Sequence, residues 1–206
     1  MTDAPFRPFE TNLDEATALS ILRAAVAGAE DGELYLERKR SEAIVLDDGR
    51  IKTASYDASE GFGLRAVKGE VAGYAHSTEI SEHALRRASE TARLAVGDGG
   101  GVLADAPKGT NQRLYSDADP MADATFAAKI DVLKEIDAFT RGLDPRVVQV
   151  SATISAGLQE VEILRPEGLQ LRDVRPMARI NISVIVEQAG RRERGGMGGG
   201  GRFGPP

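Results

Sequence analysis

The sequence predicts an α+β fold made of two units, each a helix followed by an antiparallel meander of strands. Apolar residues recur at helical spacing in three stretches, near residues 11–28, 78–96 and 120–143. The sequence that follows the first and the third stretch alternates with a period of two, as half-buried strands do. No stretch requires a parallel crossover, so we expect a mainly antiparallel sheet.

The first unit is expected at about residues 11–96. Its first helix opens at TNLD (residues 11–14), which has the pattern of a capping box. Asp48-Gly49 lies between two β-rich runs and predicts a two-residue hairpin turn. A second helix is expected from about Thr78 to Val96. The expected strands are residues 33–40, the hairpin 41–57, 61–67 and 71–76.

The second unit is expected at about residues 119–189, after a polar linker rich in proline and glycine at about 97–118. Asp119-Pro120 has the pattern of an N-cap followed by proline at the first helical position. The helix ends near Gly142. Four strands should follow, at residues 147–155, 158–164, 169–176 and 178–188. The sequence leaves open whether the two meanders share one sheet.

Composition narrows the class of protein. The 206 residues are 41% hydrophobic and 28% charged, with a net charge of −6 and no cysteine. This balance is ordinary for a globular protein, and the negative charge disfavours nucleic acid as a partner. Neither a signal peptide nor an apolar stretch long enough to cross a bilayer is present, so we expect a cytoplasmic protein without a membrane partner.

No self-sufficient active site is evident. The two histidines, His76 and His83, are seven residues apart with Glu79 between them, but His76 is expected on a strand and no zinc motif surrounds them. Neighbouring carboxylates, Glu30-Asp31 and Asp47-Asp48, lie where turns are expected. We therefore assign no catalytic residue, no metal ligand and no cofactor to this chain.

Glycine and arginine motifs have structural interpretations. The glycines of GFGLRAVKGEVAG (residues 61–73) lie inside strand-like sequence, and GDGGGV (97–102) follows a helix without the lysine of a phosphate-binding loop. ERKR (37–40) is interpreted as a solvated strand face. The last stretch, GRRERGGMGGGGRFGPP (190–206), is expected to be a hinge-like loop.

Two of these stretches resemble a known family. YLERKRSEAIVLDDGRIKTASYDASEGFGLRAVKGEVAGYAHSTEIS (35–81), with Gly61, Gly63, Arg65 and Gly69, resembles the N-terminal region of the TldD/PmbA family, once called modulators of DNA gyrase. VIVEQAGRRERGGMGGGGRFG (184–204) resembles the segment that leads toward the catalytic half of TldD-type subunits. The two matches occur in the family's order and cover most of the chain.

The resemblance implies the N-terminal part of a zinc metallopeptidase that works as a heterodimer with a PmbA/TldE-like subunit on unfolded peptides. The family's zinc motif, HExxxH, is expected after the glycine-rich run, and neither His76 nor His83 matches a ligand of the family. The chain should therefore be a scaffold that encloses substrate and is inactive alone, with 190–206 leading to a catalytic C-terminal domain.

Four residues of the expected loop are candidates for contact with substrate or partner: Arg191, Arg194, Arg202 and Phe203. Two alternative functions remain open at this point. The chain could be a stand-alone interaction module that binds partners through a sheet edge. It could also bind nucleic acid through its arginine-glycine tail, although Glu193 and the net charge weaken that hypothesis.

Overall fold

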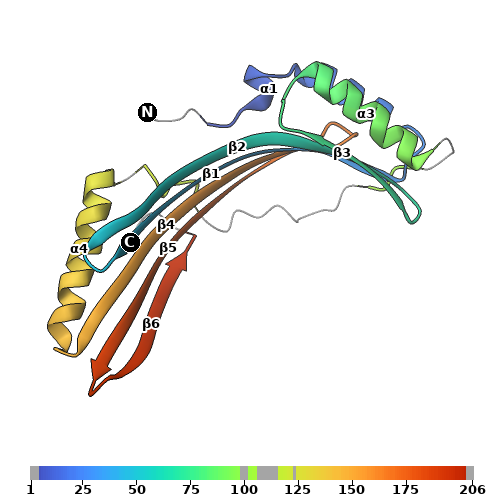
Figure 1. Ribbon diagram of the computed structural model, residues 1–206. Helices are drawn as coiled ribbons and strands as arrows, with labels where there is room; N and C mark the ends of the chain where they lie inside the picture. Colours follow the sequence, from blue (N-terminus) through green and yellow to red (C-terminus); the bar gives the residue numbers. More distant parts are fainter. Residues whose placement is uncertain (1–4, 98–101, 106–115, 123, 203–206) are drawn as a thin grey trace. The chain divides into compact units, whose positions relative to one another are not determined.

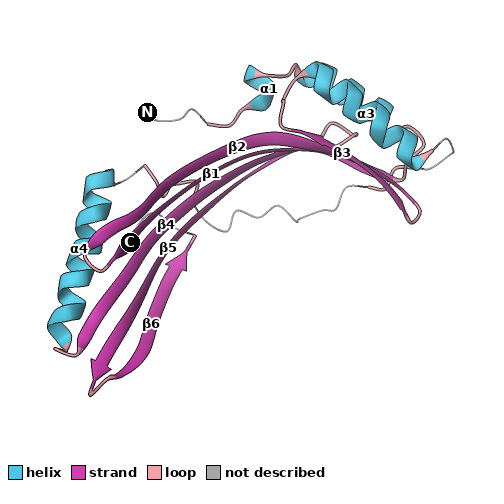
Figure 2. Ribbon diagram, in the orientation of Figure 1, coloured by secondary structure: helices cyan, strands magenta, loops and turns pink. Residues whose placement is uncertain are grey.

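The fold is α+β with a mainly antiparallel sheet, as the sequence predicts (Figures 1 and 2). The computed structural model describes residues 5–97, 102–105, 116–122 and 124–202. Their strands form a six-stranded sheet in the order β3-β2-β1-β4-β5-β6. The elements are α1 (Pro8–Thr11), α2 (Glu15–Ala25), β1 (Asp31–Asp47), β2 (Arg50–Lys68), β3 (Val71–Ser77), α3 (Glu82–Val96), α4 (Phe126–Leu143), β4 (Val147–Leu164), β5 (Gln170–Gln188) and β6 (Arg191–Gly201).

A helix followed by three strands occurs twice, as α2-β1-β2-β3 and as α4-β4-β5-β6. The prediction of four shorter strands per meander is wrong, because the expected breaks at residues 58–60, Gly157 and Pro176 lie inside continuous strands. Gly61, expected at the start of a strand, lies inside β2 at a close approach, since a Cβ there would lie 2.5 Å from the carbonyl oxygen of Ser77. Here glycine permits β2 to approach the end of β3 and does not interrupt β2.

Two tight turns have the backbone of a type I′ hairpin. Asp48 and Gly49 have φ angles of 51° and 75°, which confirms the hairpin expected there. Ala189 and Gly190, with φ angles of 51° and 77°, form a second such turn between β5 and β6. The only sequence signal for the second turn is Gly190, because alanine is rarely found at positive φ.

Three helix starts differ from the sequence prediction. Asp14 caps α2 by accepting a hydrogen bond from the Thr17 N–H at 2.8 Å, so this helix starts at Glu15 and residue 11 belongs to the separate turn α1. Ser81 caps α3, and Thr125 caps α4 well after Asp119-Pro120. In each case a hydroxyl or carboxylate nearer the apolar periodicity satisfies the first free N–H groups of the helix.

The chain forms two compact units that are discontinuous in sequence. The first contains residues 1–39, 59–114 and 159–174, and the second contains 40–58, 115–158 and 175–206. These units differ from the contiguous sub-units 11–96 and 119–189 expected from the sequence. The difference arises because β1, β2, β4 and β5 each contribute residues to both units.

In the first unit, α2 and α3 pack on one face of the strands and enclose an apolar core. Leu22 of α2 and Leu85 of α3 are completely buried, as are Leu34, Leu36 and Leu64 of the strands. The even-numbered leucines of β1 share a face because side chains alternate along a strand. The strand expected at residues 33–40 is therefore confirmed, with Leu34 and Leu36 on its buried face.

A buried ionic cluster occupies another part of the first unit. The carboxylate of Glu160, 4% exposed as a residue, accepts hydrogen bonds from the Phe6 N–H and from Arg38 Nη2, at 3.0 and 2.7 Å. Arg172 lies 3.8 Å away on a neighbouring strand. The interpretation of residues 37–40 as a solvated face is wrong, because Arg38 pairs with a buried carboxylate that lies 122 residues away in sequence.

Two carboxylates of the first unit should respond oppositely to pH. Burial raises the pKa of Asp31, but hydrogen bonding and charge from Arg165, with the charge of Arg65, outweigh it and lower that pKa below its ordinary value. Burial raises the pKa of Glu162, and Arg172 and Arg7 only partly offset that effect. The ionised form is therefore favoured by folding at Asp31 and disfavoured at Glu162.

We expect Asp31→Asn to lower the unfolding free energy by about 1–2 kcal/mol at neutral pH, because Asp31 loses charged hydrogen bonds at 2.7 and 2.8 Å. This loss should shrink as pH falls through the lowered pKa of Asp31. Glu162→Gln should instead stabilise above the raised pKa of Glu162, with the gain vanishing in acid. Urea titrations across pH would measure both, and changes of the same sign would contradict the assignment.

In the second unit, α4 packs against the sheet through Leu133. Its neighbours in the core are Ile44 and Leu46 of β1 and Ala152 of β4. Lys129 of α4 is buried but paired, since its Nζ lies 2.6 Å from Glu42 Oε1. Val132, Phe139 and Leu143 of the same helix are exposed, so the apolar surface of α4 is wider than the part that contacts this core.

Candidate functional site

Strand β6 lies at one end of the sheet order and pairs antiparallel with β5 (Figure 2). The register runs from Gln188 opposite Arg191 to Ala178 opposite Gly201. The prediction of a loop at 190–206 is therefore wrong for residues 191–201. No described strand pairs with the outer edge of β6, so its outward backbone groups form an open edge.

The glycines of β6 explain why sequence alone missed this strand. Six of the seven residues from Gly195 to Gly201 are glycine, which is depleted in strands because it adds no packing surface and loses much conformational freedom on folding. The turn that starts the strand has alanine at a position where a hairpin usually has asparagine or aspartate. The only local signal is Gly190, directly after a clear alternating strand.

The glycines differ between the two faces of β6. A Cβ at Gly200 would lie 2.5 Å from the Ala178 carbonyl oxygen, and one at Gly196 would lie 3.0 Å from that of Ile182. A Cβ at Gly195 or Gly199 would meet no atom within 4 Å. Gly196 and Gly200 thus lie too close to the β5 backbone to carry a side chain, whereas Gly195 and Gly199 have room for one.

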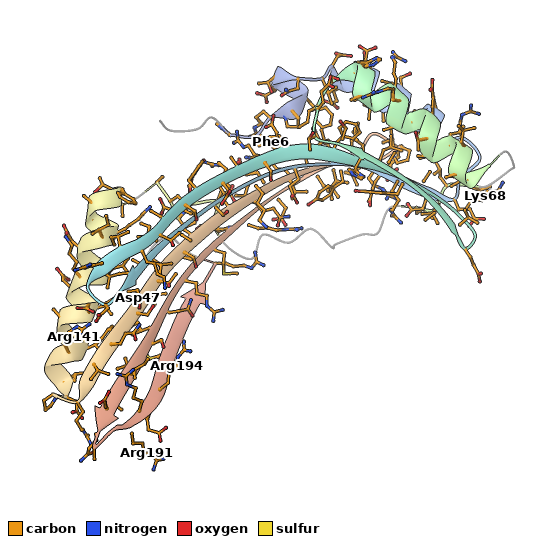
Figure 3. The ribbon with its side chains drawn as sticks, in the orientation of Figure 1. Phe6, Asp47, Lys68, Arg141, Arg191 and Arg194 are labelled. Atoms are coloured by element: carbon orange, nitrogen blue, oxygen red, sulfur yellow. The ribbon has the colours of Figure 1, made fainter. Side chains whose placement is uncertain are left out.

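The even-numbered face carries a polar groove with a volume of about 610 Å³. Arg194 extends from β6 on this side (Figure 3), and its Nε donates to Ser183 Oγ at 2.9 Å. The side chains of Asn181 and Ser183 on β5 and of Ser151 and Thr153 on β4 contribute hydrogen-bonding groups. The groove is lined by Ser151, Thr153, Asn181, Ile182, Ser183, Arg194, Gly195, Gly196, Met197 and Gly198.

The odd-numbered face of β6 adjoins an apolar surface. Met197 lies opposite Ile182 in the register, and directly opposed residues project to the same face. Met197 is 71% exposed. We call this surface the apolar hairpin face, and it consists of Ile180, Ile182, Val184, Val186 and Met197. A small cavity of about 100 Å³, which Val132 of α4 helps to line, adjoins it at Ile180.

Arg146 holds the base of the hairpin. Its carbonyl oxygen accepts from the Glu187 N–H at 2.8 Å, and its Nη1 donates to Gln188 Oε1 at 2.9 Å. The same guanidinium hydrogen bonds with Asp144 and lowers the pKa of that carboxyl to about 2. These contacts fix the end of β5 where the turn into β6 begins.

The structure separates the three described members of the four residues expected to contact substrate or partner. Arg194 lies in the polar groove, whereas Arg191 projects to the other face and its Nε donates to Glu193 Oε1 at 2.7 Å (Figure 3). Arg202 directly follows β6 and is exposed. Phe203 lies outside the described residues. Asn181 and Ser183 lie in the strand expected at residues 178–188, and only the pairing of β5 with β6 brings them next to Arg194.

The other open edge in the second unit has a different character. On the side away from β1, no described strand pairs with residues 50–58 of β2, since β3 pairs with β2 only from Phe62 onward. This edge carries Arg50, Lys52 and Asp57, and charged side chains discourage the pairing of edges. The run Gly195–Gly201 has no charged side chain and leaves its backbone accessible.

The described residues contain no group of three or more His, Asp or Glu side chains that could hold a metal ion, so they do not fit the zinc that the family implies. His76 stacks on Tyr74 with ring centroids 5.7 Å apart on β3, and His83 belongs to α3. Asp47 accepts from Gln149, and Asp48 pairs with Arg141, so these carboxylates have structural contacts. None of the described helices has the length and apolar character needed to cross a membrane.

Two family models match most of the chain. The model of the PmbA/TldA metallopeptidase domain 1 matches residues 32–96, and the model of the central domain matches residues 119–204. The second match includes β5, β6 and the whole polar groove.

Curated relatives are similar in sequence over nearly the whole chain. A metalloprotease TldD homolog of Haemophilus influenzae is 34% identical over 94% of this chain and 41% of its own length. A TldD homolog of Buchnera aphidicola subsp. Acyrthosiphon pisum is 33% identical over 83% of this chain and 36% of its own length. The chain thus spans about two fifths of the relatives that it matches.

Solved structures share the fold at low identity. A crystallised protein from Bacteroides thetaiotaomicron, described as a modulator of DNA gyrase, is 15% identical with a TM-score of 0.70, over 92% of this chain and 45% of that one. TldE from Thermococcus kodakarensis is 15% identical with a TM-score of 0.63, over 89% of this chain and 42% of that one. With domain models, sequence relatives and fold in agreement, the chain belongs to the PmbA/TldD family of metallopeptidases.

Proposed function

We propose that this chain forms the substrate-binding, non-catalytic part of a TldD-like zinc metallopeptidase of the cytoplasm, and that β6 binds unfolded peptides through its open edge. The observation that carries the proposal is the bare backbone of Gly195–Gly201 at the end of the sheet. An edge strand presents unpaired N–H and C=O groups, and an extended peptide satisfies them by adding a strand.

Backbone pairing suits a peptidase that acts on unfolded chains. The hydrogen bonds are made to peptide groups that every sequence contains, so binding requires an extended conformation more than a particular residue. The seven residues from Gly195 to Gly201 span about 23 Å at about 3.3 Å per residue, enough for a peptide of similar length. The adjoining polar groove provides room for side chains on one face.

The catalytic metal is proposed to bind elsewhere in the complete protein. The described residues offer no metal cluster, and the relatives are more than twice as long as the region they share with this chain. We propose that a following HExxxH segment supplies the zinc site and that a PmbA/TldE-like subunit completes the enzyme. The chain alone would then be a scaffold without activity.

We expect the 206-residue chain to bind no stoichiometric zinc and to cleave no peptide, while still binding an extended peptide. NMR titration with a threonine-rich peptide should shift the amide signals of β6 and leave those of the charged β2 edge in place. The same peptide with proline at every second position should not bind, because proline lacks the N–H donor. Zinc-dependent cleavage by this chain, or shifts confined to other elements, would contradict the proposal.

In the complete enzyme, alanine at Arg191, Arg194, Arg202 and Phe203 together should lower peptide cleavage. Arg194→Ala alone should account for most of the loss, because Arg194 is the member of this set that lines the polar groove. Arg86→Ala, at an exposed helix position, is the matched control. Unchanged cleavage in the quadruple variant would rule out a role for these side chains.

The open edge also supports the second candidate, a stand-alone module that binds folded partners by sheet extension. Size measurement combined with the peptide titration discriminates between the two, since a module would bind one folded partner and ignore unfolded peptides. Nucleic-acid binding is less favoured by the structure. Arg191 and Arg192 lie within ion-pair distance of Glu193 and Glu187, which reduces the positive charge available to phosphates.

A further inference from the structure

We propose that β6 selects peptides whose apolar side chains alternate with polar ones, with the apolar side chains next to Gly195 and Gly199. This inference rests on the proposed binding of peptides to the β6 edge. It adds a substrate class to that function: extended segments with the alternating pattern of a half-buried strand.

The glycines on the two faces of β6 differ in the space around them. Side chains of a peptide paired with β6 would project alternately to the two faces of the sheet. On one face, Gly196 and Gly200 pack closely on the β5 backbone, with 3.0 and 2.5 Å between a built Cβ and the nearest carbonyl oxygen. On the other face, Gly195 and Gly199 have no neighbour within 4 Å of that position. Gly195 and Gly199 thus leave room for a side chain directly above them, whereas the open space on the first face is the polar groove.

Two apolar side chains of β5 lie beyond the open space above Gly195 and Gly199. Gly195 is opposite Val184, and Gly199 is opposite Ile180. These two side chains belong to the apolar hairpin face and are partly exposed. Because the glycines carry no side chain, nothing on β6 covers Val184 and Ile180 except Met197, which lies between them in the register.

A long side chain on the added strand can span the distance to β5. A strand added to β6 would lie about 10 Å from β5, two strand spacings away. Long apolar or aromatic side chains lean across a glycine on the neighbouring strand and cover it, an arrangement known to restore the stability of glycine-containing edges. A leucine or phenylalanine beside Gly195 or Gly199 would therefore contact the apolar hairpin face, whereas a residue displaced by one position would not.

The face of β6 that carries the polar groove favours polar peptide side chains. There the alternate peptide side chains would enter the polar groove, near Asn181, Ser183 and Arg194. Polar side chains keep their hydrogen bonds in this groove, and an apolar side chain would leave groups such as the Ser183 hydroxyl without water. The two faces together specify an alternating peptide.

The test compares two peptides of about seven residues, matched to the length of Gly195–Gly201. Both contain the same leucines and threonines between terminal lysines, alternating in one peptide and grouped in the other. We expect the alternating peptide to bind the 206-residue chain about tenfold more tightly in NMR or calorimetric titration, a ratio that corresponds to about 1.4 kcal/mol. Equal affinity would overturn the selectivity, and binding of neither peptide would instead overturn the proposed function.

Gly199→Val supplies the matched variant. Its side chain would occupy the open space above β6, and valine favours strands, so the fold should be retained. The preference for the alternating peptide should fall toward twofold. Ser183→Ala removes one hydroxyl from the polar groove and should lower the preference only in part. A larger loss than in Gly199→Val would place the main selecting contacts in the polar groove and overturn the role of the apolar hairpin face.

Discussion

Replacing Arg38 with alanine is expected to lower the unfolding free energy by about 3–5 kcal/mol. Arg38 Nε and Nη2 donate to Glu160 Oε2 at 3.0 and 2.7 Å, and the carboxylate is 6% exposed. Removing the guanidinium leaves a buried negative charge with weaker partners, and the desolvation of that charge is no longer offset. The guanidinium carbon also lies 5.5 Å from the centre of the Phe6 ring, so packing is lost with the charge.

Arg86→Ala is the control for this substitution. Arg86 pairs with Glu82 at 2.6 Å, a shorter distance than many in the protein, but the two side chains are 58% and 55% exposed. An exposed helical pair of this kind contributes about 0.3–0.5 kcal/mol. Urea unfolding of both variants measures the difference. Equal losses would show that burial of Glu160 does not decide the energy of its ion pair.

Replacing Gly200 with valine is expected to weaken binding of a threonine-rich extended peptide by at least about tenfold, or about 1.4 kcal/mol. A Cβ at this position would lie 2.5 Å from the Ala178 carbonyl oxygen and 3.0 Å from the Arg179 Cα. Both obstacles are backbone, so the end of β6 must move away from β5. The peptide would then lose the edge with which it pairs.

Gly199→Val is the adjacent control, with the same change of side chain but open space around it. It should bind the threonine-rich peptide as the parent chain does. NMR titration of the two variants gives the affinities, and amide hydrogen exchange reports whether β6 remains paired. If both variants keep the parent affinity, the peptide does not bind at β6.

Much of the fold could be predicted locally. The apolar periodicity of α3 and the alternation of β5 identify these elements, and Asp48-Gly49 marks a hairpin whose φ angles require such residues. The continuity of the strands was not predictable in this way. Gly61 is expected at the start of a strand, and only the position of Ser77 shows that it lies at a close approach inside β2.

The candidate site was the least predictable part. Arg194 and Phe203 are candidates because of their residue types in an expected loop. The position of Arg194 is set instead by the pairing of β6 with β5 and by its hydrogen bond to Ser183, eleven residues earlier. Ala189 does not predict a hairpin turn, because alanine is rarely found at positive φ. It adopts this φ here because β5 and β6 pair on either side of the turn. The difference between Gly199 and Gly200 is also invisible in a run of glycines.

What the sequence predicts by itself depends on how far apart in the sequence the interacting residues lie. Periodicity, charge and the Asp48-Gly49 turn depend on neighbouring residues, and they were sufficient for the α+β class and for the resemblance to the PmbA/TldD family. The partly buried position of Arg38 depends on its pairing with Glu160, 122 residues away. Strand β6 depends on β5 in the same way, since glycine by itself is depleted in strands and takes this conformation because a partner supplies the hydrogen bonds.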